Sequence, residues 1–313
     1  MNDQTLTILM PVFNAGPFVA DAISSVLGQT HQKFSLLILN DGSTDDTLEI
    51  CRRFEEQDAR VRVFTHENIG IANTMNTALE KIDGGWVFCM HGDDIMMPNR
   101  LERQLAFIEE NPDLAVVSSL VQLIDEQGRE IGRSKSSLVN RKSVSRMVGR
   151  GLCVAFNHPA TAFRADVVKS VGGYRQEFWP AEDTDLWNRV AREHPVLVQE
   201  EYLLKYRIHG RSASNSKSRL MVRKLAWVAR CIDSQRSHEA EPSWDEFLSE
   251  RQHAPWLVRW NNQRKETART LYQAAVQCFA CRQYGALISA LAGALVLEPS
   301  LVLPRILPRL LTR

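Results

Sequence analysis

Two adjacent carboxylates, Asp93 and Asp94, follow the short apolar run Trp86–Met90 and a glycine. Adjacent acids in a turn are costly unless water or a cation balances their charge, and hard divalent ions commonly bridge carboxylates to a diphosphate. The pair therefore predicts a Mg²⁺ or Mn²⁺ site that holds a nucleoside diphosphate. The alternative is an exposed pair of acids that favours the N-terminus of the following helix.

A third acid, Asp41, follows another apolar run and precedes Gly42, which permits a sharp turn with positive φ. Its carboxylate could accept from a ribose hydroxyl or a base N–H, and it could also form the turn that caps a helix beginning near Thr44. Phe13 lies in an earlier turn, where its ring could stack on a base or pack in the core.

Three acids, Glu182, Asp183 and Asp185, enter a predicted helix together. Capping and the helix dipole explain one or two of them. One carboxylate is then a candidate general base that takes the proton from a sugar hydroxyl. Two histidines also lie in polar turns: His209 is a metal or phosphate ligand or a structural residue, and His91 orients a ligand or caps its turn.

Apolar runs alternate with helical patterns over the first 120 residues. Strands are predicted at Leu6–Met10, Phe34–Leu39, Val61–Phe64, Trp86–Met90 and Ala115–Val121. Such alternation predicts an α/β fold, a doubly wound and mainly parallel sheet with helices on both faces. Ligands of such sheets bind at the carboxyl ends of the strands. The polar turns that follow the first, second and fourth strands should therefore meet at one edge.

After Arg219 the pattern is helical, with a hairpin of helices predicted at 268–281 and 286–297. We predict an α/β domain over residues 1–214 and a C-terminal helical region over residues 215–313.

The charges of the chain nearly balance, with 38 Lys and Arg residues against 37 Asp and Glu residues. This balance argues against nucleic acid as a partner. Residues 251–313, however, carry nine basic and two acidic residues. This region predicts either a peripheral contact with an anionic membrane through Arg305, Arg309 and Arg313, or a helical face packed against the domain.

The six cysteines do not suggest a disulfide framework, and the lone pair Cys278 and Cys281 is a weak indication of zinc. No basic leader precedes the first strand, and the longest apolar run, residues 286–297, is shorter than the roughly 18 residues that span a bilayer. We expect a cytoplasmic protein, peripheral at the inner face of the plasma membrane if the basic tail contacts lipid. Motifs of P-loop, dinucleotide-binding and α/β-hydrolase enzymes are absent.

Nine short stretches, taken in order, resemble the family 2 glycosyltransferases with the GT-A fold. They are Ile8–Ala15, Gln29–Thr30, Leu39–Asp45, Glu67–Ala72, Gly92–Ile95, Asn157–Thr161, Gly172–Tyr174, Ala181–Leu186 and Tyr206–His209. The resemblance implies transfer of a sugar, with inversion, from a nucleotide-diphosphate donor, often UDP-linked. The acceptor would be a hydroxyl of a glycan or of a lipid-linked molecule in bacterial cell-surface polysaccharide synthesis.

The resemblance also implies roles for single residues. Asp183 matches the catalytic base, Asp93 and Asp94 match the motif that holds metal and diphosphate, and His209 falls where some members place an additional ligand. Asp41 is expected to contact the base or the ribose. The other positions expected at the donor are Pro11, Phe13, Asn14, Asn68 and Gly70.

Two positions depart from the family pattern. Asn40 stands where the family often has the first acid of a DDG motif, and His91 stands where it often has the first acid of a D-x-D-D motif. We expect metal binding to survive, with altered affinity and choice of metal. Two other functions stay open. A sugar nucleotidyltransferase usually has a Gly-rich basic loop after the first strand, which is absent here. A glycosyltransferase-like binding module would not need the retained acids.

Overall fold

The computed structural model describes residues 6–210 and 217–311, with side chains as far as Arg305. It divides into two compact units. The first comprises residues up to Leu123, Glu130–Glu177 and Glu182–Arg207, and the second comprises Ile124–Arg129, Phe178–Ala181 and the chain from Ile208 onward. The predicted boundary between residues 214 and 215 lies outside the described residues.

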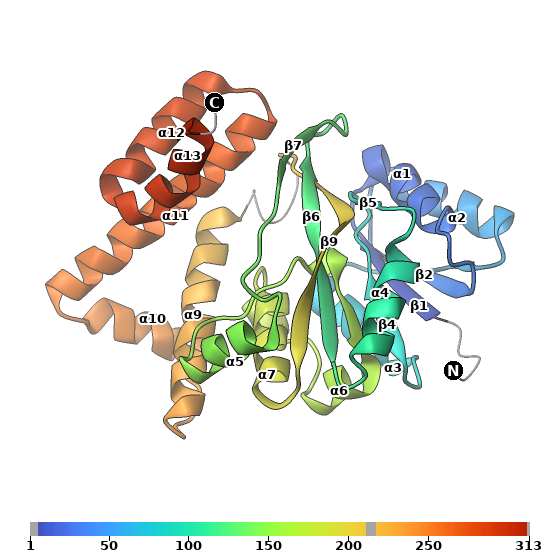
Figure 1. Cartoon of the computed structure of the whole chain (residues 1–313), viewed down its shortest axis with the longest axis horizontal. Coiled ribbons are helices and arrows are strands. Elements are labelled where there is room, and N and C mark those ends of the chain that lie inside the picture. Colours follow the sequence, from blue (N-terminus) through green and yellow to red (C-terminus); the bar gives the residue numbers. More distant parts are fainter. Residues whose placement is uncertain (1–5, 211–216, 312–313) are drawn as a thin grey trace. The chain divides into compact units, whose positions relative to one another are not determined.

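A nine-stranded sheet forms the first unit, in the order β3-β2-β1-β4-β8-β6-β9-β5 with β7 paired to β6 (Figure 1). The strands are β1 (Leu6–Val12), β2 (Phe34–Asp41), β3 (Val61–His66), β4 (Trp86–Cys89), β5 (Ile95–Met96), β6 (Val116–Ile124), β7 (Glu130–Arg133), β8 (Ala162–Arg164) and β9 (Val196–Arg207). This arrangement confirms the predicted α/β fold and all five of the strands predicted in its first half.

The sheet is mixed rather than parallel throughout. Strands β1 to β4 pair in parallel, whereas β8 is antiparallel to both β4 and β6, and β5 is antiparallel to β9. The helical crossover after β4 leaves a gap between β4 and β6. The short β8 enters this gap from the carboxyl end of β4, so it can only run in the opposite direction.

Helices connect and cover the strands of the first unit. They are α1 (Gly16–Leu27), α2 (Thr47–Gln57), α3 (Ile71–Glu80), α4 (Arg100–Glu110), α5 (Arg141–Gly149), α6 (Ala165–Ser170) and α7 (Glu182–Glu193), with the 3-10 turns η1 (His158–Ala160) and η2 (Gln176–Phe178). The last five residues of β1 are all buried. Burial of successive residues means that both faces of this strand are covered, as expected of a parallel strand.

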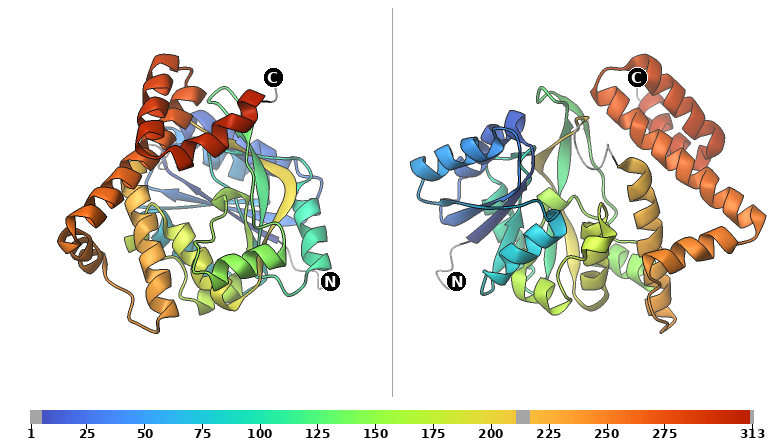
Figure 2. Two further views of the ribbon diagram at one scale, coloured as in Figure 1. Left: turned by 60° about the vertical axis from the view of Figure 1, so that its left-hand side comes forward. Right: turned by 180° about the vertical axis from the view of Figure 1, so that it is seen from behind.

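The second unit is helical from Ser218 onward. Its helices are α9 (Ser218–Arg236), α10 (Trp244–His253), α11 (Trp256–Ala280), α12 (Tyr284–Leu297) and α13 (Pro299–Leu311). Helices α11 and α12 lie side by side, which confirms the predicted hairpin (Figure 2). The described helices include none that is both long enough and apolar enough to cross a bilayer. The cysteines of the CxxC pair are free thiols.

Candidate active site

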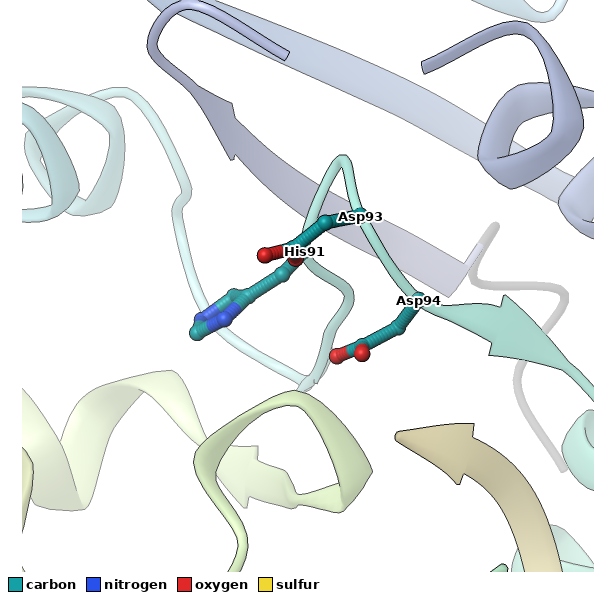
Figure 3. Close-up of side chains that lie close together, drawn as sticks. All are labelled: His91, Asp93 and Asp94. Carbon is teal, nitrogen blue, oxygen red and sulfur yellow. The ribbon is translucent and has the colours of Figure 1, made fainter. Parts of the chain in front are cut away.

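The turn between β4 and β5 carries His91, Asp93 and Asp94, whose ligand-type atoms all lie within 4.8 Å of one another. Figure 3 shows the three side chains pointing to the same side of this turn. Gly92 lets the turn lie close to β1, because a Cβ at this position would stand 2.7 Å from Cγ1 of Val12. The sequence therefore places two carboxylates and an imidazole together at the end of a central strand.

The Asp94 carboxylate is 1% exposed. Its Oδ1 accepts the backbone N–H of Arg207 at 2.8 Å, and its Oδ2 is buried without a hydrogen-bond partner among the described residues. Burial, and then the neighbouring Asp93, hold the pKa of Asp94 well above its ordinary value. A buried carboxylate oxygen that lacks a partner is costly. A divalent cation would satisfy it, so these residues fit such an ion.

Arg207 also fixes the backbone of this turn. Its Nε donates to the carbonyl oxygen of Asp93 at 2.8 Å, and its guanidinium lies 4.8 Å from the centre of the Phe18 ring. The end of β9 thus sets the position of both acids.

A chain of polar side chains extends from the half-buried His91 to the buried Tyr174. His91 Nε2 lies 2.8 Å from His158 Nδ1, and His158 Nε2 lies 2.8 Å from the Tyr174 hydroxyl and 3.7 Å from the Cys89 sulfur. Burial lowers the pKa of His91, and burial followed by the neighbouring His91 lowers the pKa of His158 well below its ordinary value. Both rings are therefore neutral at physiological pH.

Arg100 holds the backbone around this chain. It is fully buried, and its guanidinium donates to the carbonyl oxygens of Pro159 at 2.7 Å, Cys89 at 3.0 Å and Thr161 at 3.2 Å. Burial lowers its pKa to about 10, so it stays charged. Arg100 thereby joins the end of β4 to η1 and holds His158 beside the turn that carries Asp93 and Asp94.

The three acids at the start of α7 have different surroundings. Asp185 is held in ion pairs by Arg175 and Arg189, so its role is structural. Asp183 Oδ1 accepts from the Thr184 backbone at 2.6 Å. Burial raises the pKa of Asp183 to about 6. A carboxylate with this pKa can accept a proton at neutral pH.

Glu182, next to Asp183, has one buried oxygen that finds no partner in the described part of the chain. Burial, and then the charge of Asp183, raise the pKa of Glu182 to about 8. This acid therefore carries a proton at neutral pH and leaves Asp183 as the charged member of the pair.

Asp183 lies within electrostatic range of the chain of polar side chains at the end of β4. Burial is the main reason that the pKa of Cys89 is raised to about 11, and the charge of Asp183 adds to it. Burial, the Cys89 thiol and then Asp183 raise the pKa of Tyr174 well above its ordinary value. Trp187 of α7 stacks on the His158 ring with the ring centres 5.9 Å apart, and its ring centre lies 6.3 Å from that of Tyr174. Helix α7 therefore packs against the polar side chains that reach the turn with Asp93 and Asp94.

A second group of turns lies after β1 and β2. Asp41 Oδ1 accepts the N–H of Ile69 at 2.8 Å, and its Oδ2 accepts the N–H of Gly70 at 3.1 Å. Asn68 donates back to the Asp41 carbonyl at 2.9 Å. Gly42 has a φ of 70° and allows a close approach, since a Cβ there would lie 2.6 Å from the Asn68 nitrogen. Asp41 therefore orders the turn that contains Asn68 and Gly70.

The turn after β1 is bonded to the turn after β2. Asn14, with a φ of 49°, donates its backbone N–H to Ser43 Oγ and accepts the Thr44 N–H on its Oδ1, at 3.0 and 2.8 Å. Pro11 is buried. The Phe13 ring is 52% exposed and does not pack in the core. An exposed ring next to polar turns favours the interpretation that it stacks on a base.

His209, the predicted additional metal ligand, is buried in the second unit. Its role as a ligand stays a prediction. Sequence reasoning assigned no role to Arg100, His158, Tyr174 or Arg207. His158 and Tyr174 lie in stretches that matched the family pattern, and that signal could have pointed to them.

Comparisons with known proteins identify the family of this chain. Residues 7–172 match the family described as glycosyl transferase family 2. The O-antigen biosynthesis glycosyltransferase WbnJ of Escherichia coli is 32% identical over 217 residues, which cover 67% of this chain and 82% of that protein.

Two solved structures share the fold. The UDP complex of S. aureus TarS 1-349 matches with a TM-score of 0.53 and 14% identity, over 94% of this chain and 90% of that one. The mannosyltransferase PcManGT from Pyrobaculum calidifontis, in complex with GDP-Man and Mn²⁺, matches with a TM-score of 0.59 and 15% identity, over 96% and 80%. The fold is the predicted GT-A type, and the chain belongs to glycosyl transferase family 2.

Proposed function

We propose that this glycosyltransferase transfers a sugar from a UDP-linked donor to a hydroxyl of a glycan or lipid-linked acceptor, with inversion at the anomeric carbon. The observation that carries the proposal is that a candidate base and a candidate cation site belong to connected parts of the first unit. A carboxylate with a raised pKa, Asp183, lies in the first turn of α7, whose Trp187 stacks on His158, and His158 contacts His91 of the β4–β5 turn. The E. coli relative named for O-antigen biosynthesis supports an acceptor in cell-surface polysaccharide synthesis.

In this proposal Asp183 takes the proton of the acceptor hydroxyl as the new glycosidic bond forms. Thr184 holds the carboxylate in place through its backbone N–H. Asp93 and Asp94, with His209 as the predicted additional ligand, would hold Mg²⁺ or Mn²⁺. The cation would supply positive charge against the leaving diphosphate.

The turns after β1 and β2 form the donor-binding side of the proposal. The exposed Phe13 ring would stack on the base, and Asp41 would contact the base or the ribose. Both oxygens of Asp41 already accept one backbone N–H, but each retains a further lone pair that can accept from the donor. Pro11, Asn14, Asn68 and Gly70 would shape the surrounding turns.

The test is the Asp183→Asn variant, which removes the base and keeps the shape of the side chain. We expect its turnover to fall by about 10²- to 10⁴-fold, while calorimetric titration gives an unchanged affinity for UDP with Mn²⁺. Asp166→Asn is the matched control, because Asp166 is an exposed acid paired with Arg164. Near-wild-type transfer by Asp183→Asn would show that another group is the base.

Assays of the products separate this function from its rivals. The proposal predicts release of free UDP and a product whose anomeric configuration, measured by NMR, is inverted. Release of pyrophosphate would indicate a sugar nucleotidyltransferase. No nucleotide release from common donors with Mn²⁺ would indicate a binding module.

We also propose a peripheral contact of the C-terminal tail with an anionic membrane. Arg305 lies over the Tyr272 ring at 5.4 Å, whereas the side chains of Arg309 and Arg313 lie outside the described residues. Deletion of residues 300–313 is expected to weaken binding to vesicles that contain anionic lipid. Unchanged vesicle binding would exclude this contact.

A further inference from the structure

We infer that His91 is a nitrogen ligand of the catalytic cation, with its Nε2 donating to His158, so that the site favours transition-metal ions over Mg²⁺. This inference rests on the proposed function, since it concerns the same cation. His91 is a residue that departs from the family pattern. An imidazole stands where an acid is usual, and its ligand-type atom lies within 4.8 Å of those of Asp93 and Asp94.

The bonding of His91 leaves one ring nitrogen for a ligand role. Its Nε2 faces His158 Nδ1 at 2.8 Å. Between two neutral imidazoles, one nitrogen of such a contact carries the proton and the other accepts it. If His91 Nε2 donates, His91 Nδ1 holds a lone pair and can bind a cation. If His158 Nδ1 donates, His91 Nδ1 carries a proton and cannot.

The Tyr174 hydroxyl is compatible with the first arrangement, because it can accept as well as donate. When His91 Nε2 donates to His158 Nδ1, the proton of His158 lies on Nε2 and points to the Tyr174 oxygen, 2.8 Å away. The Tyr174 oxygen accepts this proton, and the Cys89 sulfur lies on the same side, 3.7 Å from His158 Nε2. The whole chain can therefore be oriented away from the cation without changing its net charge.

A second observation points to a ligand at the same place. Asp94 Oδ2 is buried and finds no hydrogen-bond partner within the described residues. An orphaned oxygen and an imidazole nitrogen together form a mixed donor set. Mg²⁺ prefers oxygen ligands and retains its water, whereas affinity of nitrogen-containing sites rises from Mn²⁺ to Co²⁺. Histidine ligands also commonly donate their second nitrogen to a fixed acceptor, which here is His158.

The main experiment measures the nitrogen directly. Wild-type protein is loaded with Mn²⁺ alone and with Mn²⁺ and UDP, and pulsed EPR detects the coupling of Mn²⁺ to an imidazole ¹⁴N. We expect the coupling in the wild type and its loss in His91→Asp and in His91→Asn. His31→Asp is the matched control. The His31 ring lies near the surface, and its hydrogen bond within the described residues is with the Lys33 carbonyl. Circular dichroism verifies that each variant is folded.

Calorimetric titration supplies a second readout. In His91→Asp, the preference for Co²⁺ over Mg²⁺ is expected to fall by about tenfold or more. In His158→Ala, the loss of the acceptor should weaken Co²⁺ binding by about 10- to 100-fold and leave Mg²⁺ binding nearly unchanged. His158→Gln, whose amide oxygen can accept from His91 Nε2, should restore most of the Co²⁺ affinity.

The outcomes distinguish this inference from the proposed function. Bound Mn²⁺ without ¹⁴N coupling, or coupling that persists in both His91 variants, would overturn the role of His91 and leave the cation site standing. An unchanged metal preference in His91→Asp would do the same. If the wild type binds no Mn²⁺ with or without UDP, both the inference and the proposed cation site are wrong.

Discussion

The carboxylate of Asp41 receives two backbone N–H groups, whereas that of Asp94 keeps a buried oxygen for which the described residues offer no partner. Asp41 ends β2 and Asp94 lies in the turn between β4 and β5 of the same sheet, and both are at least 95% buried. The Asp41 carboxylate is satisfied by the fold alone, so it stabilises the turn around Asn68. The Asp94 carboxylate is not satisfied by the fold. Burial of its oxygen without a partner destabilises the folded state, and a bound cation would offset this loss of stability.

The same contrast divides the acids of α7. Asp185 is neutralised by Arg175 and Arg189, while Glu182 and Asp183 have raised pKa values because of burial. An acid paired with two arginines and two acids for which the described residues show no ion pair thus lie one turn of helix apart or less. Buried acids whose charge is not balanced by an arginine, rather than acids in general, therefore indicate the reaction site.

The largest effect is expected for Asp94→Asn, which removes the unsatisfied charge. The amide oxygen can still accept the Arg207 N–H, so the fold should be kept. The cation would then stabilise the transition state of transfer less well, by about 4 kcal/mol. This loss corresponds to a roughly thousandfold decrease in kcat. The measurement is UDP release with Mn²⁺. Asp113→Asn is the control, because Asp113 is an exposed acid paired with Arg141. Full activity of Asp94→Asn would show that the buried Asp94 carboxylate is not needed for transfer.

The next effect concerns the satisfied acid. Asp41→Ala removes two charge-assisted hydrogen bonds, each worth about 1.5–3 kcal/mol, and the free energy of unfolding should fall by about 3 kcal/mol. Urea denaturation measures this loss. Asp46→Ala should stay close to the wild type, because Asp46 precedes α2 without a side-chain cap bond. Equal stability of the two variants would mean that Asp41 does not hold its turn.

Local pattern explains why the first half of the fold could be predicted. The alternation of apolar runs and helices gave β1 to β4 and their polar turns, since each is encoded within a few residues. Strand β8 could not be predicted in this way. Its three residues pair with β4, which lies far away in the sequence, and no local periodicity encodes that pairing.

The candidate site shows the same limit. Three acids at the start of a helix are equivalent in the sequence, and only the positions of Arg175 and Arg189 single out Asp185 as structural. The contact of His91 with His158 joins residues 67 positions apart. The sequence identifies these residue types, but the tertiary structure decides which of them remain available for chemistry.

A smaller effect is expected on stability from Asp183→Asn. Burial raises the pKa of Asp183 from 3.8 to about 6. The protonated form is thus favoured in the folded state, and stability is lost as pH rises from 3.8 through 6. The amide variant avoids this loss. We expect it to be more stable than the wild type by about 2 kcal/mol at pH 8, with a gain that shrinks toward pH 4. A variant that is less stable at pH 8 would contradict the cost assigned to this acid.

The smallest effect is the pH dependence of transfer. Asp183 accepts a proton only when ionised, and burial raises its pKa to about 6. The value of kcat/KM should therefore reach a plateau above pH 6 and fall by about tenfold per pH unit below it. UDP binding, measured over the same range, separates this ionisation from donor binding. A flat profile between pH 5 and 8 would mean that Asp183 is not the group whose ionisation controls transfer, and the contrast between satisfied and unsatisfied acids would then concern stability alone.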